Sequence, residues 1–174
     1  MKLKELLESK SPVYVLSWTT TPWTLPGNVA LAVGEGIEYI LAERGGEQII
    51  IAAARLGEVA GKETRVIKKI SAKDLVELTY EPLFDVRQLQ SEKSHRIYVA
   101  PFVSDEEGTG VVHTAVMYGE DDYRLGTEVG LPKFHTVTED GKFIAELKEL
   151  GGMPVKDKAT EEKILKILEG KNLL

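Results

Sequence analysis

The chain has 174 residues, no cysteine, and 28 acidic against 22 basic residues, which gives a formal net charge of −6 at pH 7. A chain of this length can bury a core without cross-links to stabilise it. The lack of cysteine excludes disulfides, thiolate nucleophiles and sulfur-ligated zinc. The acidic balance excludes a global positive field for nucleic acid, and the apolar runs are too short for a membrane span, so we expect a soluble cytoplasmic chain.

The first half of the sequence is rich in strand patterns. Leu3, Leu6 and Leu7 share one helical face, which predicts a short leading helix over residues 2–9. β-Rich runs separated by Pro-Gly, Gly-Glu-Gly and Gly-Gly turns then predict strands at residues 13–20, 29–33, 38–44 and 47–52. Short helices are predicted at 53–60 and 72–78, the second capped by Ser71, with a strand at 64–70 between them.

The second half alternates strand and helix patterns. Strands are predicted at 95–103, 110–116 and 133–138, with a hairpin turn at 139–142. An acidic first turn and a closing glycine predict a helix within 119–130, and an amphipathic helix follows at 159–168, where Thr160 could act as the cap. We therefore expect an α+β fold with a mostly antiparallel, barrel-like β core and peripheral helices, forming a single domain over residues 1–174.

Familiar catalytic patterns are missing from the sequence. It contains no G-x-S-x-G elbow, no P-loop and no G-x-G-x-x-G motif, and His95, His113 and His135 are not spaced as metal ligands. We expect neither a cofactor nor a metal site. What remains are two stretches rich in small hydroxyls, glycines and carboxylates, "WTTTPWTLPGN" (18–28) and "GTGVVHTAVMYGEDDY" (108–123).

Each of these stretches has an ordinary structural explanation. Threonine favours strands, and Pro26-Gly27 suits a type II turn, so the first stretch could be a strand that ends in a turn. His113 lies in an apolar strand pattern, where a hydrogen-bonded core histidine is more common than a catalytic one. Asp121 and Asp122 could simply favour a helix N-terminus, by about 0.3–1 kcal/mol each.

Together, the two stretches resemble a known family. "SWTTTPWTLPGN", followed about ninety residues later by "GTGVVHTA" and "GEDDYRLG", resembles the inserted editing domain (CP1, connective polypeptide) of class I aminoacyl-tRNA synthetases over nearly the whole chain. Valyl and leucyl relatives tend to carry an arginine where Thr21 stands, so "TTTPW" resembles the isoleucyl branch. The chain departs from the family pattern at 116–118, because relatives usually have proline after the histidine-threonine-alanine triplet.

The resemblance implies a function: hydrolysis of the ester of mischarged valyl-tRNA of the isoleucine acceptor. Neither the H-I-G-H nor the K-M-S-K-S type of signature occurs, so we expect no ATP-dependent ligation by this chain, which resembles an editing module excised from a longer synthetase. The implied partners are the 3′ end of a tRNA that carries a mischarged amino acid and the remainder of the synthetase. We expect a monomer and no membrane partner.

The same resemblance implies roles for individual residues. Asp122 would anchor the α-ammonium of the amino acid and His113 would exclude the larger side chain. Asp122 would support catalysis together with Thr20 and Thr21, which position the ester and water. The implied substrate-binding residues, which would hold the ester and the terminal adenosine or let backbone approach them, are Thr19, Trp23, Thr24, His113, Gly108 and Gly110.

Three alternatives stay open at the level of the sequence. The chain could be an editing domain of a valyl-type synthetase that clears threonine from valine tRNA. It could be a non-catalytic module that binds an aminoacyl group or a nucleotide. It could also be a structural insertion with a decayed site, to which the departure at 116–118 would point; the presence of Thr19 to Thr21, His113 and Asp122 argues against decay.

Overall fold

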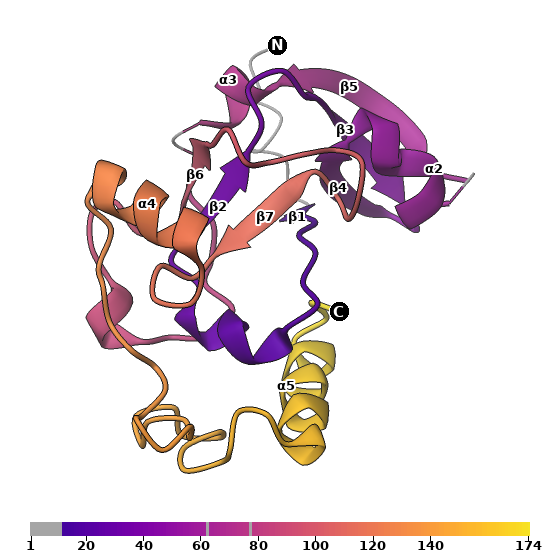
Figure 1. Ribbon diagram of the computed structural model, residues 1–174. Helices are drawn as coiled ribbons and strands as arrows, with labels where there is room; N and C mark the ends of the chain where they lie inside the picture. The colour runs from indigo at the N-terminus through magenta and orange to yellow at the C-terminus, as the bar shows by residue number, and fades with distance from the viewer. Residues whose placement is uncertain (1–11, 62, 77) are drawn as a thin grey trace. The chain divides into compact units, whose positions relative to one another are not determined.

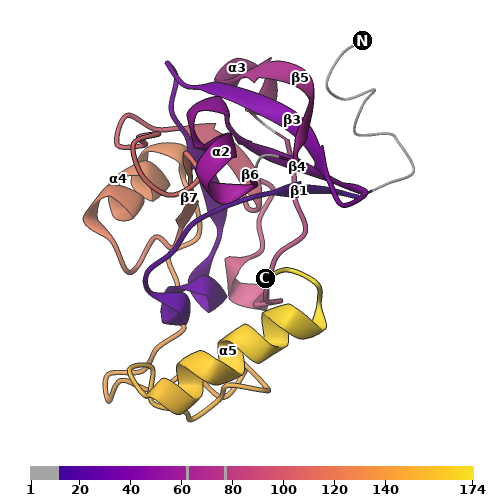
Figure 2. The same cartoon turned by 90° about the vertical axis from the view of Figure 1, so that its right-hand side faces the viewer.

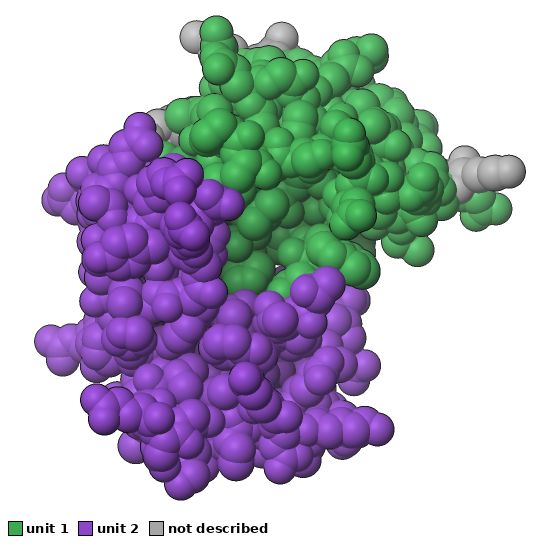
Figure 3. Space-filling view, in the orientation of Figure 1, with its two compact units in different colours: residues 1–19, 31–79, 96–113 green, residues 20–30, 80–95, 114–174 purple. Residues whose placement is uncertain are grey.

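The computed structural model describes residues 12–61, 63–76 and 78–174, which divide into two compact units. Unit 1 contains the described residues up to Thr19, then Leu31–Thr79 and Arg96–His113; unit 2 contains Thr20–Ala30, Tyr80–His95 and Thr114–Leu174. Figure 3 shows unit 1 in green and unit 2 in purple. The helix predicted at residues 2–9 lies outside the described residues, and a single domain over 1–174 stays a prediction.

The larger sheet of unit 1 has four strands in the order β1-β4-β3-β5, which can be followed in Figure 2. These strands are β1 (Val13–Val15), β4 (Glu47–Ala52), β3 (Glu38–Arg44) and β5 (Arg65–Ser71). β1 pairs with β4 in parallel, whereas β3 pairs antiparallel with both β4 and β5. Gly45 and Gly46, with φ of 59° and 88°, form the tight turn between β3 and β4, a conformation that glycine adopts at little cost.

Both faces of the central strands of this sheet are buried. Side chains alternate between faces, so Ile40 and Ile51 lie on one face, in a cluster with the partly buried Leu56. Leu56 belongs to α2 (Leu56–Val59), which continues the 3-10 helix η2 (Ala53–Arg55) directly after β4. The opposite face is also closed to solvent, and its members are Tyr39, Leu41, Ile50 and Ala52.

The second sheet has three strands in the order β6-β2-β7, which lie side by side in Figure 1. They are β6 (Arg96–Val99), β2 (Ala30–Val33) and β7 (Val111–Thr114), and every residue of β2 is buried. The short helix α3 (Ala72–Leu75) contacts β6 and follows β5. It begins at the predicted cap, because Ser71 and Asp74 form a reciprocal capping box.

Unit 2 is mostly helical and irregular. Its elements are the 3-10 helices η1 (Pro22–Gly27) and η3 (Arg87–Leu89) and the α-helices α4 (Glu120–Val129) and α5 (Lys158–Gly170). α4 ends, as predicted, at a glycine in the left-handed conformation, Gly130. α5 packs against η1, below it in Figure 1. The cap of α5 is Asp157, whose carboxylate accepts the Ala159 N–H; Thr160, which the sequence suggested as the cap, is fully buried.

The α+β class is confirmed, with two sheets in the described chain in place of one closed barrel. The strands predicted at 13–20 and 95–103 were too long, because residues 16–20 form only an isolated bridge at Trp18 and the second strand is β6, Arg96–Val99. The strand predicted at 133–138 was wrong, because only an isolated bridge forms there, at Val137. The predicted type II turn at Pro26-Gly27 is instead the end of η1. Among the described residues, no helix has the length and apolar character needed to cross a bilayer.

Candidate functional site

The threonine segment folds as the approach to η1. Thr20 and Thr21 are exposed, and Pro22 occupies the first position of η1, where its missing N–H costs nothing. The Thr21 carbonyl accepts two hydrogen bonds from Thr24, one from its N–H (3.0 Å) and one from its hydroxyl (2.9 Å). Thr24 is buried, so it shapes this turn from within, while Thr20 and Thr21 present their side chains outward.

The ring of Tyr118 joins three segments of unit 2. It meets Trp23 edge to face, with centroids 5.2 Å apart, and a Cβ added to Gly27 would come within 2.8 Å of it. The Tyr118 hydroxyl accepts the Thr136 N–H at 2.7 Å and also bonds the Thr136 hydroxyl at 2.9 Å. Sequence reasoning noted Tyr118 only as a departure from a family pattern. The signal that could have pointed to Tyr118 is its hydroxyl, because a tyrosine hydroxyl that becomes buried requires a hydrogen-bond partner.

Asp122 lies in the first turn of α4 and is half-buried. Its Oδ2 accepts the backbone N–H of Ala115 at 3.0 Å, and Gly119 leaves room beside it, because a Cβ there would lie 3.2 Å from Oδ2. Burial raises the pKa of the Asp122 carboxyl, the hydrogen bond from Ala115 lowers it, and the neighbouring charge of Asp121 raises it. Among the described residues, no hydrogen bond to Oδ1 is seen.

His113 lies in β7 and is 8% exposed. Burial lowers the pKa of its imidazole from 6.5 to about 4, because the charged form loses its hydration. The ring is therefore neutral at pH 7. A neutral, buried imidazole suits a steric or hydrogen-bonding role better than a role as a cation.

The two glycines of the "GTG" sequence form a tight loop in unit 1. Gly108 and Gly110 have φ of 61° and 72°, which L side chains rarely adopt. A Cβ on Gly108 would lie 2.9 Å from the Cβ of Trp18, and one on Gly110 would lie 2.4 Å from the Cβ of Ala52. Both positions therefore require glycine for conformation and for space.

A pocket of about 330 Å³ lies beside this loop. Trp18, which is 59% exposed, forms part of its wall and bridges Val112 in parallel register. The half-buried Thr19 follows Trp18 in the chain. The lining residues are Trp18, Phe102, Ser104 and Glu106 to Val112.

Comparison with known proteins points to one family. No protein-family profile matches the sequence. Isoleucine–tRNA ligases from Clostridium tetani and Methanothermobacter thermautotrophicus are 38% and 41% identical over 161 and 162 residues, each covering 92% of this chain. The chain is homologous to a segment of the isoleucine–tRNA ligases. It spans 15% of the length of each of these two relatives.

Solved structures similar to this chain include CP1 editing domains. The crystal structure of GlLeuRS-CP1 has a TM-score of 0.74 and 18% identity, with coverage of 98% of this chain and 86% of that one. The editing domain of the Plasmodium falciparum cytosolic leucyl-tRNA synthetase has a TM-score of 0.67 and 12% identity, with coverage of 93% and 78%. The segment therefore has the CP1 editing-domain fold, in agreement with the resemblance seen in the sequence.

The predicted site residues of this CP1-type segment are divided between its units. Unit 2 brings Thr21 together with Thr24 and places Asp122 against Ala115; unit 1 brings Gly108 against Trp18. The remaining members are Thr20 and Trp23 in unit 2 and Thr19, Gly110 and His113 in unit 1. Among the described residues, no group of three or more side chains could hold a metal ion.

Proposed function

We propose that this chain is an editing domain that hydrolyses the ester bond of valyl-tRNA formed on the isoleucine acceptor. The observation that carries the proposal is the identity of 38–41% to isoleucine–tRNA ligases over 92% of the chain, together with the CP1 fold. Such a domain has a physical purpose. Isoleucine and valine differ by one methylene, which changes the binding free energy in an apolar pocket by only about 1–3 kcal/mol. Isoleucyl-tRNA synthetases are a standard example of this limit. A second, hydrolytic site then removes the smaller product.

In this proposal Asp122 anchors the substrate by its free α-ammonium. A carboxylate is the natural partner of an ammonium, and Oδ1 has no donor among the described residues. The Ala115 N–H fixes the orientation of the carboxylate through Oδ2. An ammonium bound there would lower the pKa of Asp122 and so oppose the effect of burial. An amino acid blocked at its nitrogen would lose this contact.

His113 excludes isoleucine in the same proposal. Its burial and its low pKa, about 4, support a neutral ring whose volume limits the side chain that can enter. The low pKa also makes His113 a weak general base at pH 7. We therefore assign it to substrate selection.

The chemical step is the attack of water on the ester carbonyl. A bond forms from the water oxygen to the carbonyl carbon, the bond from that carbon to the ribose oxygen breaks, and a proton from the water reaches the ribose oxygen. Because the ester is already activated, orientation of water and donors for the developing oxyanion supply most of what is required. The exposed Thr20 and Thr21 are assigned to orient ester and water, with assistance from Thr19.

The terminal adenosine is assigned to an aromatic residue, a buried threonine and the backbone of the glycine loop. Trp23 is held by Tyr118, and Thr24 fixes the turn that presents Thr21. Gly108 and Gly110, whose side-chain positions are taken by Trp18 and Ala52, are assigned to present loop backbone to the nucleoside. In these assignments, one set of residues binds the nucleoside and another set orients the ester.

The partners in this proposal are the tRNA 3′ end and the remainder of a synthetase chain. The net charge of −6 gives the chain little attraction for the tRNA backbone. Most affinity for tRNA would come from other parts of the synthetase, and binding by this chain would weaken further as salt rises.

The test of the proposal uses two mischarged tRNAs at low salt and high protein concentration. Faster hydrolysis of valine from isoleucine tRNA than of threonine from valine tRNA supports the isoleucine assignment. The opposite preference assigns the chain to the valyl type. If neither ester is cleaved while a non-hydrolysable valyl-adenosine analogue binds, the chain is a binding module and the hydrolytic proposal is wrong.

A further inference from the structure

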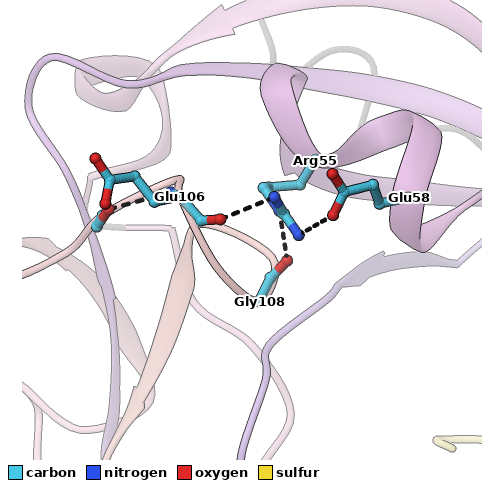
Figure 4. Close-up of polar contacts among 5 residues, drawn as sticks. Arg55, Glu58, Glu106 and Gly108 are labelled. Carbon is cyan, nitrogen blue, oxygen red and sulfur yellow. Dashed lines mark hydrogen bonds and ion pairs between the residues drawn. The ribbon is translucent and has the colours of Figure 1, made fainter.

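Arg55 makes an unusual set of contacts for a charged residue outside the recognised motifs. Its side chain is 14% exposed and its guanidinium reaches the glycine loop of unit 1. Nε donates to the Gly108 carbonyl at 3.1 Å and Nη1 donates to the Glu106 carbonyl at 2.9 Å. On its other side, Nη2 pairs with Glu58 in α2 (Figure 4). One side chain thus links the loop to the helix that follows β4.

The loop is held at further points, but by single contacts. The Thr109 carbonyl accepts the Ala52 N–H at 3.0 Å, and the Gly110 carbonyl accepts the Tyr39 hydroxyl at 2.7 Å. Arg55 differs because its planar fork binds two loop carbonyls at once and carries a charge, which strengthens each hydrogen bond. The two glycines allow this loop many conformations, so its observed shape depends on such external contacts.

We propose that Arg55 is a positioning residue for the aminoacyl-ester substrate. By binding the carbonyls of Glu106 and Gly108 it fixes the loop in the shape that brings Gly108 against Trp18 and forms the wall of the adjacent pocket. Arg55 acts through the loop and takes no part in bond making. The inference rests on the proposed editing function, because it assigns the loop to substrate binding.

The kinetic test compares Arg55→Gln with the unmodified chain in hydrolysis of valyl-tRNA of the isoleucine acceptor. We expect KM to rise about tenfold with kcat changed less than twofold, because loss of both carbonyl contacts would leave the loop in its binding shape only about a tenth of the time. Arg55→Lys keeps the charge but not the fork and should give an intermediate KM. A purely stabilising role for Arg55 would leave KM unchanged below the melting temperature, and that result would overturn the inference.

Two matched variants serve as controls. Arg65→Gln removes another arginine of unit 1, which is 69% exposed and pairs with Glu43 at 2.7 Å on the sheet surface. Glu58→Gln removes the ion pair to Arg55 but leaves both carbonyl contacts in place. We expect KM within twofold of the original value for both. A tenfold rise in either one would show that general charge or helix α2, and not the loop contacts, determines KM.

Amide hydrogen exchange gives a readout that does not depend on hydrolysis. The Ala52 N–H donates to the loop at Thr109, whereas the Leu16 N–H donates to Ile50 within the sheet, both at 3.0 Å. In Arg55→Gln we expect at least tenfold faster exchange at Ala52 and unchanged exchange at Leu16. Unchanged exchange at both amides would overturn the inference even if the unmodified chain hydrolyses valyl-tRNA. If the chain hydrolyses no ester, the proposed function fails and exchange at Ala52 alone decides whether Arg55 holds the loop.

Discussion

The carboxylate of Asp122 accepts the backbone N–H of Ala115 at 3.0 Å, which ties the first turn of α4 to the segment that follows β7. The same carboxylate is the proposed anchor of the substrate ammonium. Asp122 therefore has a structural contact as well as a proposed binding role. A substitution that tests the second role must preserve the first.

Asp122→Asn meets this requirement, because its amide oxygen can still accept the Ala115 N–H while the charge is lost. We expect kcat/KM for valyl-tRNA of the isoleucine acceptor to fall roughly 10- to 150-fold, the value of a hydrogen bond between charged groups. The free energy of unfolding in urea should change by less than about 1 kcal/mol. Asp122→Ala removes both functions and should lower stability as well as activity.

Asp121→Asn is the control for charge in this turn. Asp121 is exposed and lies 3.5 Å from Arg124, so its removal should leave hydrolysis within about twofold. Equal losses of activity in Asp121→Asn and Asp122→Asn would mean that the helix N-terminus needs negative charge in general, and the anchoring role would be wrong.

His113 gives a prediction about specificity. If its ring excludes the larger amino acid, His113→Ala opens space and the variant should hydrolyse isoleucyl-tRNA at a rate approaching that for valyl-tRNA. The ratio of the two kcat/KM values measures this directly. Continued rejection of isoleucine by a folded variant would remove His113 from the selection mechanism.

His113 also predicts a pH dependence of stability. Its folded-state pKa is about 4 against 6.5 for an unburied histidine, so between these values the unfolded chain binds a proton that the folded chain does not. The contribution of His113 to the free energy of unfolding therefore decreases as pH falls from 6.5 to 4, by up to about 1.4 kcal/mol per pH unit.

The pH effect can be isolated with His113→Gln, measured by urea unfolding at several pH values. The His95 pKa is also lowered by burial and acts in the same direction, and the raised pKa of Asp122 acts in the opposite direction. His95 and Asp122 are present in both the unmodified chain and His113→Gln, so their contributions cancel when the two free energies of unfolding are subtracted. Parallel stability curves for the two proteins between pH 6.5 and 4 would contradict a neutral, buried His113.

Tyr118 gives a prediction about the architecture of unit 2. Tyr118→Phe removes the acceptor of the N–H of Thr136, a residue that is fully buried. Leaving that donor unsatisfied should lower the free energy of unfolding by about 1–3 kcal/mol. The control is Tyr123→Phe on α4, because Tyr123 is exposed and its ring, which Lys133 contacts at 3.9 Å, is kept. Equal stability of the two variants would show that the Tyr118 hydroxyl does not hold this part of the chain together.

Elements with strong local patterns were predictable from the sequence. The predicted bounds of β3 and β4, 38–44 and 47–52, agree with the structure because continuous apolar runs flank a Gly-Gly turn. The cap at Ser71 and the closing glycine of α4 were also predictable, since each depends on residues within one or two turns. Local chemistry of this kind needs no knowledge of distant contacts.

Features that depend on distant contacts were not predictable in this way. The segment after β1 has strand propensity, yet residues 16–20 form only one isolated bridge, between Trp18 and the distant Val112. Arg55 lies 53 positions from Gly108 in the chain, and nothing near it in the sequence indicates the loop that it holds. The resemblance to a family supplied the candidate residues, while the structure supplied the supporting contacts of Tyr118 and Arg55.

The most direct measurement compares hydrolysis of valyl-tRNA and isoleucyl-tRNA, both on the isoleucine acceptor, by this chain at low salt and high protein concentration. The account predicts release of valine with isoleucine largely retained. Equal release of both amino acids, or release of neither by the folded chain, would contradict the claim that it is a selective editing domain.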